Sequence, residues 1–519
     1  MQHPARALLL TLIALCALAA QDPKPAPAAV SAAASAAPAT AKAEVAEPAP
    51  VVRPHEITLQ GKTLHYKTTT GRMPIRNAAG ETEAWIFYTA YTLDGAKDAS
   101  TSGVPDFAKR KLVFSFNGGP GSSSVWLHLG AIGPMRVKLN DDGSLPAAPY
   151  KLVPNEGSWL EQADLVFIDP VGTGYSRATK PELSKKFFGL QGDIESMGEF
   201  IRMYLTRNNR WLSPLFLAGE SYGTTRCAGL SGYLVEHGIA LNGIFLISTV
   251  LNFGTLEFDH FNDLAYELML PSYTATAWYH KRLAPDLQKD LKTALKESES
   301  FATDGYLKAL NQGDRMSASD RQAAVAKLAR LTGLSAEFID RAELRVDLDL
   351  FQRELLRGQN LVTGRLDSRL TGPGQRAATL TPEFDPSMAT IRPPYTAAWY
   401  QYVRTELGYE SDDSYYILGG GVHGWDFGSD NRYADVTEPL RLAFEKNPHM
   451  KLYIGAGYFD MATPYFAAWY TLDHMALPDA AKANIRRHTY ESGHMYYIHL
   501  DSLRAMKRDV TSFFDWAVQ

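Results

Sequence analysis

This sequence of 519 residues has few cysteines and only a small excess of negative over positive charge. Its two cysteines are Cys16 and Cys227, and its 52 Lys and Arg nearly balance its 57 Asp and Glu, for a net charge of −5 at pH 7. A surface with so little excess charge gives no reason to expect nucleic acid or an anionic membrane as a partner. If processing removes Cys16, Cys227 is left alone and no intrachain disulfide forms.

One long apolar run lies at the N-terminus, where Arg6 precedes ALLLTLIALCALAA. The run is too short to span a membrane comfortably and ends in small residues, so residues 1–20 are predicted to be a signal peptide. Residues 21–51 are rich in Ala and Pro and are predicted to be a disordered linker. We therefore expect an exported protein, periplasmic or secreted, without stable membrane association after cleavage. The lack of disulfides favours a bacterial source.

The rest of the chain mixes strand-like and helix-like segments. Residues 57–70 and 83–93 alternate apolar and polar side chains, which is typical of antiparallel strands. Short, fully apolar runs follow, as in a sheet that is covered on both faces: residues 111–116, 164–169, 215–219, 244–248 and 451–455. Residues 192–211 have apolar positions at helical spacing. The pattern predicts an α/β fold with a mainly parallel central sheet and an antiparallel edge.

The strand signal is missing between residues 255 and 395. These residues are predicted to form a helical cap inserted between two parts of the core, 52–254 and 396–519. Within the cap, Ser319 is expected to begin a helix that ends at Gly333, and a second helix is expected to end at Gly358. Such an insertion is either a lid over a site or a block away from it, and both interpretations stay open.

A glycine-flanked serine carries the strongest chemical signal. Ser221 lies in GESYG, residues 219–223, after an apolar run and before a helical pattern. The motif G-x-S-x-G in this setting predicts a sharp strand-to-helix turn that projects the serine hydroxyl above the sheet. Because a serine hydroxyl is a weak nucleophile at neutral pH, it needs a base and an acid that orients the base.

The acid and then the base are expected later in the chain. Asp460 follows the apolar run 451–455, and His494 follows residues 485–491, a possible last strand. His494 would take the proton of Ser221 as general base, and Asp460 would orient the imidazole ring. Other candidates lie in less suitable positions within or beside predicted helices and strands: Asp473, His474, His488 and His499.

A glycine-rich loop is predicted to complete the site. The sequence NGGPGSSS begins at Asn117, directly after an apolar run. A tetrahedral oxyanion needs N–H donors, and we expect these from Tyr222 and from Gly119 or Gly118 in the loop. The loop itself lacks the glycine and lysine spacing of phosphate loops and the ligand clusters of metal sites. A purely structural turn is the alternative.

Together these motifs resemble those of the serine carboxypeptidases. The set comprises NGGPGSSS, DPVGTGYS, GESYG, the loop that holds Asp460, and SGHM, and it spans residues 110–500. The resemblance implies an α/β-hydrolase fold with a helical insertion and removal of the C-terminal residue from peptide substrates. It also implies that the chemistry needs neither a metal nor an organic cofactor.

The resemblance further assigns roles to individual residues. The implied triad and oxyanion-hole residues are Ser221, Asp460, His494, Gly119 and Tyr222, and the implied binding residues for the substrate's terminal carboxylate are Asn117, Gly118 and Glu220. Since two carboxylates repel each other, the family keeps a carboxyl protonated there, which favours acidic conditions. The family's second glutamate is missing, because Ala131 stands at its place. We therefore expect a weaker dependence on acidic pH.

Two alternatives remain open. An esterase or acyltransferase would use the same triad, because the motifs do not specify what attacks the acyl-serine intermediate. A non-catalytic binding protein on a hydrolase fold is the alternative of another class. The motifs specify neither the preferred substrate side chain nor the oligomeric state.

Overall fold

The computed structural model describes residues 47–94, 108–376 and 378–519. The expected signal peptide and most of the expected linker lie outside the described residues. In the described ranges, no helix combines the length and the apolar character that a bilayer span requires. The first strand begins at Val51, close to the predicted start of the folded core.

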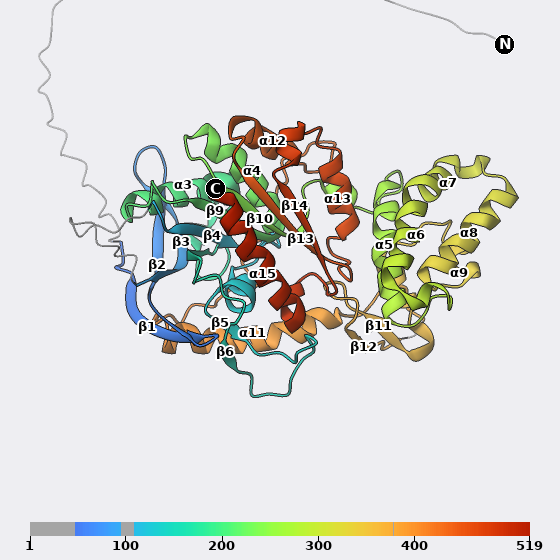
Figure 1. Cartoon of the computed structure of the whole chain (residues 1–519), viewed down its shortest axis with the longest axis horizontal. Helices are drawn as coiled ribbons and strands as arrows, with labels where there is room; N and C mark the ends of the chain where they lie inside the picture. The colour runs from blue at the N-terminus through green and yellow to red at the C-terminus, as the bar shows by residue number, and fades with distance from the viewer. Residues whose placement is uncertain (1–46, 95–107, 377) are drawn as a thin grey trace, which may run out of the picture. The chain divides into compact units, whose positions relative to one another are not determined.

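A ten-stranded sheet forms the centre of the fold (Figure 1). Its strands follow the order β1-β2-β3-β7-β4-β9-β10-β13-β14, with β8 paired beside β3. The antiparallel edge consists of β1 (Val51–Leu59), β2 (Lys62–Arg76), β3 (Thr82–Leu93) and β8 (Arg177–Ala178). The parallel part consists of β7 (Ala163–Ile168), β4 (Lys111–Phe116), β9 (Leu215–Ser221), β10 (Gly243–Thr249), β13 (Lys451–Gly457) and β14 (Ile485–Tyr490). The predicted α/β class and antiparallel edge are confirmed.

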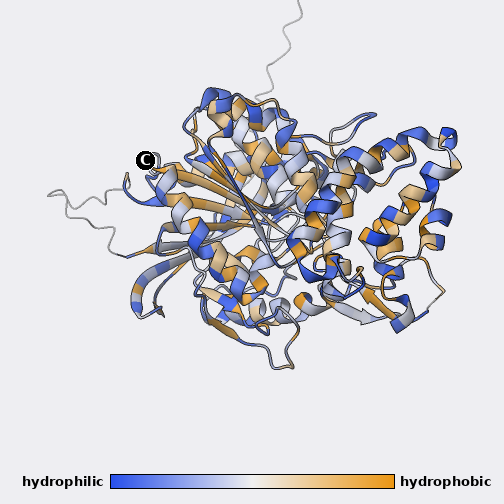
Figure 2. Cartoon of the chain, turned by 45° about the vertical axis from the view of Figure 1, so that its right-hand side comes forward, coloured by the Kyte–Doolittle hydropathy of each residue, from blue (hydrophilic) through white to orange (hydrophobic). Residues whose placement is uncertain are grey.

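The continuous apolar runs are explained by helices on both faces of the sheet. In β4, Val113 enters one apolar cluster while Leu112 and Phe114 enter the other. One face is covered by α11 (Pro386–Thr405) and α15 (Leu500–Ala517), and the other by α3 (Leu190–Arg207), α4 (Tyr222–Glu236) and α12 (Thr437–Lys446). Figure 2 shows the strands largely in the hydrophobic colour between these layers. Each central strand must therefore be apolar on both sides.

Between β10 and β13 the chain forms a mainly helical block with an apolar cluster of its own. Its helices are α5 (Leu264–Tyr279), α6 (Leu291–Phe301), α7 (Leu307–Gln312), α8 (Ala318–Thr332), α9 (Ala336–Arg341) and α10 (Leu348–Glu354), drawn green to yellow in Figure 1. A hairpin of β11 (Leu361–Thr363) and β12 (Thr371–Pro373) follows. The expected boundary at residue 395 falls inside α11, which packs on the sheet through Ile391 and Trp399.

Two helix boundaries in this block differ from the predictions. The cap of α8 is Ser317, whose Oγ accepts a hydrogen bond from the backbone N–H of Asp320, so Ser319 lies inside the first turn. Either serine could cap the helix by its residue type, and Ser317 does so because its backbone is extended, as an N-cap requires. The predicted end of α8 at Gly333, in the left-handed conformation, is confirmed.

The predicted end of the next helix at Gly358 is wrong. Helix α10 ends at Glu354, and the left-handed residue that follows the short turn Arg357–Gln359 is Asn360. Asparagine tolerates this conformation better than most side chains do. The remaining short α-helices and strands are α1 (Val125–Leu127), β5 (Met135–Val137), β6 (Leu152–Pro154), α2 (Ser184–Phe187), α13 (Tyr465–Asp473) and α14 (Asp479–Lys482).

Candidate active site

Ser221 occupies a strained turn between β9 and α4. Its backbone has φ of 60° and ψ of −130°, a conformation that non-glycine residues rarely adopt. A side chain at Gly219 would overlap the carbonyl oxygen of Gly223, so the turn requires glycine there. The turn is the predicted nucleophile elbow, and with the strand order it identifies the predicted α/β-hydrolase fold.

Asp460 and His494 form a hydrogen-bonded pair above the ends of β13 and β14. Asp460 is fully buried, and its Oδ2 lies 2.8 Å from Nδ1 of His494. The same carboxylate accepts bonds from the N–H of Ala462, and from both the N–H and the hydroxyl of Thr463, at 2.7–3.0 Å. Because an ionised carboxylate only accepts, we assign the shared proton to Nδ1, which leaves Nε2 as the basic nitrogen.

The surroundings of His494 favour its charged form. Burial alone would lower the pKa of His494, but the charge and hydrogen bond of Asp460 outweigh burial and raise the pKa above its usual value. Glu220 adds to this rise, and Arg365 opposes it. An imidazolium that forms during proton transfer is therefore stabilised where it forms.

A cavity of about 340 Å³ joins the candidate residues. The cavity is lined by these predicted site residues: Asn117, Gly118, Gly119, Glu220, Ser221, Tyr222 and His494. Asp460 does not line the cavity, because it lies behind His494. The hydroxyl of Ser221 makes no hydrogen bond within the described ranges, so proton transfer to His494 requires the two side chains to approach when substrate binds, as in many unliganded sites. None of the competing residues Asp473, His474, His488 and His499 lines the cavity.

The glycine-rich loop lies directly against the elbow. A Cβ at Gly118 would overlap the backbone nitrogen of Tyr222 and come within 2.7 Å of that of Gly223. Gly119 has φ of 106°, in the region that favours glycine, and its N–H makes no hydrogen bond to a described residue. The contact brings the loop backbone and the start of α4 together beside Ser221, where an oxyanion would form.

Glu220 is a buried carboxyl group at the wall of the cavity. Its Oε2 accepts hydrogen bonds from Asn117 Nδ2 at 2.6 Å and from the Tyr497 hydroxyl at 2.7 Å. Asn117 Oδ1 accepts from the N–H of Leu127, which fixes the orientation of the amide. Burial raises the pKa of Glu220 to about 7, against the effect of His494 and of both hydrogen bonds. This carboxyl is therefore partly protonated near neutral pH.

Ala131 lies where the resemblance calls for a second acid, and its surroundings are apolar. It is fully buried in the cluster that also holds Leu129 and Tyr497. The hydroxyl of Tyr497, three residues after His494, instead contacts Glu220. Tyr497 was not among the residues predicted from the sequence, where its signal is slight: a tyrosine pair follows SGHM.

Arg226 is a second residue at the site that was not predicted from the sequence. Its guanidinium is fully buried beneath the elbow, where Nε donates to Asp193 Oδ2 at 2.7 Å and Nη1 donates to the Asn117 carbonyl at 2.6 Å. It thereby ties α4 and α3 to the first residue of the loop. The signal in the sequence was an arginine in the first turns of a helix whose other residues are uncharged up to Glu236.

The helical block contributes to the same cavity. Phe258, Met269 and Leu348 line it together with the loops of the core, and Arg365 lies at its exposed side. Among the residues that the structure describes, no group of three or more His, Cys, Asp or Glu side chains is placed to hold a metal ion.

The sequence is similar to those of known serine carboxypeptidases and carboxypeptidase-like proteins. A family model described as serine carboxypeptidase matches residues 66–505. A serine carboxypeptidase-like 5 of Arabidopsis thaliana is 34% identical over 114 residues, which are 21% of this chain and 25% of that protein. A pheromone-processing carboxypeptidase KEX1 of Arthroderma otae is 35% identical over 123 residues, 22% of this chain and 16% of that protein. The matched segments thus span a quarter or less of these relatives.

A proline iminopeptidase structure from Mycobacterium smegmatis is similar in outline only. It is 12% identical and covers 86% of this chain and 98% of its own, with a TM-score of 0.34. A likeness of this extent adds nothing to the fold that the strand order and the elbow already establish.

Proposed function

Because the chain belongs to the serine carboxypeptidase family, we propose that it removes C-terminal residues from peptides as a serine-type carboxypeptidase. One observation carries the proposal. The strained Ser221 and the Asp460-paired His494 share a cavity with a buried carboxyl group, Glu220, that is itself held by Asn117. The cavity thus combines the parts for acyl transfer with a group that can bind a carboxylate once it is protonated.

The proposed first half of the reaction forms an acyl-enzyme. The Oγ of Ser221 bonds to the carbonyl carbon of the last peptide bond while its proton passes to Nε2 of His494. The carbonyl oxygen becomes an oxyanion that accepts bonds from the N–H groups of Gly119 and Tyr222. The C–N bond then breaks, and His494 returns the proton to the departing amine, so the C-terminal amino acid leaves.

The second half of the proposed reaction is hydrolysis. A water molecule attacks the acyl carbon and gives a proton to His494, and Ser221 leaves with that proton on its oxygen. The shortened peptide departs with a new carboxyl group. Asp460 remains ionised and stabilises the imidazolium in both halves.

Specificity for the peptide end is proposed to come from Asn117, Gly118 and Glu220. A substrate carboxylate beside an ionised Glu220 would be repelled, whereas a protonated Glu220 donates a hydrogen bond to it. The pKa of about 7 for Glu220 keeps this proton available up to neutral pH. This agrees with the expected weaker dependence on acidic pH.

Product analysis separates this proposal from its alternatives. We expect mass spectrometry of a defined peptide mixture to show loss of single residues from the C-terminus, and none with Ser221→Ala. Turnover of esters alone, or transfer of the acyl group to an added acceptor, would favour the esterase or acyltransferase. Absence of labelling of Ser221 by a fluorophosphonate probe in folded protein would favour the binding protein.

We also propose that the protein is exported to a bacterial periplasm or secreted. The support is the charge and apolar pattern of residues 1–20 and the buried Cys227, which has no disulfide partner among the described residues. N-terminal sequencing of the mature protein tests this: we expect a start at or near residue 21, whereas an intact Met1 would contradict export by cleavage.

A further inference from the structure

Two hydrogen-bond donors converge on one oxygen of Glu220. Asn117 Nδ2 and the Tyr497 hydroxyl both donate to Oε2, at 2.6 and 2.7 Å, and Oε1 receives no bond from a described residue. An oxygen that accepts two bonds is the poorer place for a proton. When Glu220 is protonated, the proton therefore resides on Oε1, the oxygen left for a ligand in the cavity.

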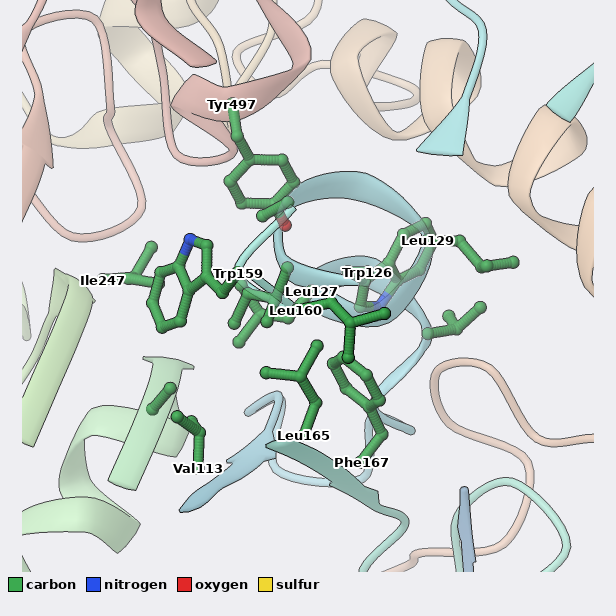
Figure 3. Packing of buried hydrophobic residues seen from close by; sticks show 14 of the residues in the cluster. Val113, Trp126, Leu127, Leu129, Trp159, Leu160, Leu165, Phe167, Ile247 and Tyr497 are labelled. Carbon is green, nitrogen blue, oxygen red and sulfur yellow. The ribbon is translucent and has the colours of Figure 1, made fainter. Parts of the chain in front are cut away.

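The fold holds Tyr497 rigidly in this position. Tyr497 is 1% exposed, and Figure 3 shows its ring pointing toward the helical turn that carries Leu127 and Leu129. A Cβ at Gly130 would lie 2.6 Å from the ring, so a glycine in this turn makes room for it. A ring packed in this way loses little freedom when its hydroxyl bonds to Glu220.

We propose that Tyr497 is a positioning residue for carboxylate recognition: it holds Glu220 so that Oε1 presents its proton to the terminal carboxylate of the substrate. The proposal rests on the carboxypeptidase function proposed above. The phenol of Tyr497 donates to Glu220 at every pH at which it keeps its proton. Glu220 therefore titrates alone, whereas the two acids of the family's usual pair would share a proton. Ala131 can then be apolar without loss of the site.

The charged and titratable groups around Glu220 set the expected pH response. His494 and Asp460 face it from the loops after β14 and β13, Tyr496 and Tyr497 from the turn after His494, and Tyr395 from α11. Of these, the Tyr497 hydroxyl lowers the pKa of Glu220 by bonding to its charged form. Removal of that hydroxyl therefore raises this pKa, and Glu220 keeps its proton to a higher pH.

The test compares Tyr497→Phe with the wild type on two substrates. One is an N-blocked dipeptide with a free carboxylate, and the other is an N-blocked amino-acid ester that lacks it. On the dipeptide we expect KM of Tyr497→Phe to rise about fivefold to tenfold, as for loss of one buried hydrogen bond. We also expect the fall of kcat/KM in alkaline solution to occur at a higher pH than in the wild type. On the ester we expect kcat/KM of Tyr497→Phe and of the wild type to agree within twofold.

Two further variants make the outcome decisive. Tyr496→Phe is the matched control, because the Tyr496 hydroxyl points against Gly455 of β13 and makes no bond to Glu220. Glu220→Gln should abolish the fall of kcat/KM at high pH for the dipeptide, because an amide that accepts the same two hydrogen bonds does not titrate. A fall that persists in Glu220→Gln overturns the proposal even if Tyr497→Phe fails to fold.

The possible failures are distinct. A wild-type enzyme that turns over the ester but never the dipeptide overturns the carboxypeptidase function. A wild-type enzyme that cleaves the dipeptide, with a Tyr497→Phe profile and KM like its own, overturns only the role of Tyr497. Equal losses on dipeptide and ester would also overturn it, because they indicate a general structural defect.

Discussion

At the scale of single residues, the site combines one strained group with several that are held by hydrogen bonds. Ser221 is presented by its backbone alone, whereas the carboxylate of Asp460 is fixed by bonds from Ala462, Thr463 and His494. This fixed carboxylate determines which nitrogen of His494 carries the proton. In the proposed mechanism, Asp460 therefore acts by orienting His494, the base.

Asp460→Asn tests that contribution. An amide can donate a hydrogen to Nδ1, so the base would adopt the wrong tautomer and kcat should fall by about 10⁴-fold with little change in KM. Steady-state kinetics on an ester substrate measure both constants. Asp473→Asn, at an exposed residue paired with Arg487, is the matched control and should match the wild type. A loss of less than tenfold for Asp460→Asn would contradict this role.

At the scale of elements, the close contact of the glycine-rich loop with the elbow organises the site. Gly118 touches the backbone of Tyr222 and Gly223, and Arg226 anchors the loop from beneath through the Asn117 carbonyl. The loop and α4 thus reach a single arrangement beside Ser221. The proposed oxyanion stabilisation would depend on this preorganisation, since donors that must move contribute less.

Gly118→Ala tests the loop contact. The added methyl would overlap the Tyr222 nitrogen, so the loop must withdraw from the elbow and kcat should fall about 10²- to 10³-fold, the loss expected for one oxyanion donor. Thermal unfolding should show that the variant remains folded. Gly358→Ala is the control, because a Cβ there meets nothing within 4 Å. Kinetics equal to the wild type in Gly118→Ala would refute the assignment.

At the scale of the whole molecule, the helical block and the sheet together form the cavity. The sheet side supplies the candidate catalytic groups, and the block supplies mainly apolar side chains, among them Phe258, Met269 and Leu348. The block has its own apolar cluster, so its surface toward the cavity can vary without disturbing the sheet. We infer that substrate preference is set by the block and favours apolar side chains next to the cleaved bond.

Leu348→Ala tests this inference against Leu350→Ala. Both leucines are partly buried on α10, but only Leu348 lines the cavity. For substrates with a large apolar residue, kcat/KM should fall about tenfold in Leu348→Ala, as for loss of a few apolar contacts. Leu350→Ala should stay within twofold of the wild type. The inference fails if both variants lose the same activity or if neither does.

The sequence was informative where local chemistry leaves a pattern. Buried parallel strands must be apolar, so residues 111–116 and 451–455 were predicted close to their observed limits, and the G-x-S-x-G pattern located Ser221. The order of acid and base in this fold pointed to Asp460 and His494. Helix limits were less accurate, because neighbouring residues such as Ser317 and Ser319 are equivalent in sequence and only backbone geometry distinguishes them.

Contacts between distant segments left almost no pattern. Tyr497 and Glu220 are 277 positions apart, and their bond depends on how the turn after His494 packs on residues 128–132. The same holds for Arg226, whose partners Asp193 and Asn117 lie on other elements. The sequence therefore predicted residues that the structure brings together at the cavity, but not the residues that hold them there.

The most direct test of the central claim is the preference of the wild-type enzyme for a free terminal carboxylate. The measurement is kcat/KM at pH 6, below the pKa of about 7 for Glu220, for an N-blocked dipeptide and for the same dipeptide with a C-terminal amide. We predict at least about a tenfold preference for the free acid, the effect of a hydrogen bond to a charged group. Equal values, or a preference for the amide, would contradict recognition of the carboxylate by Asn117, Gly118 and Glu220.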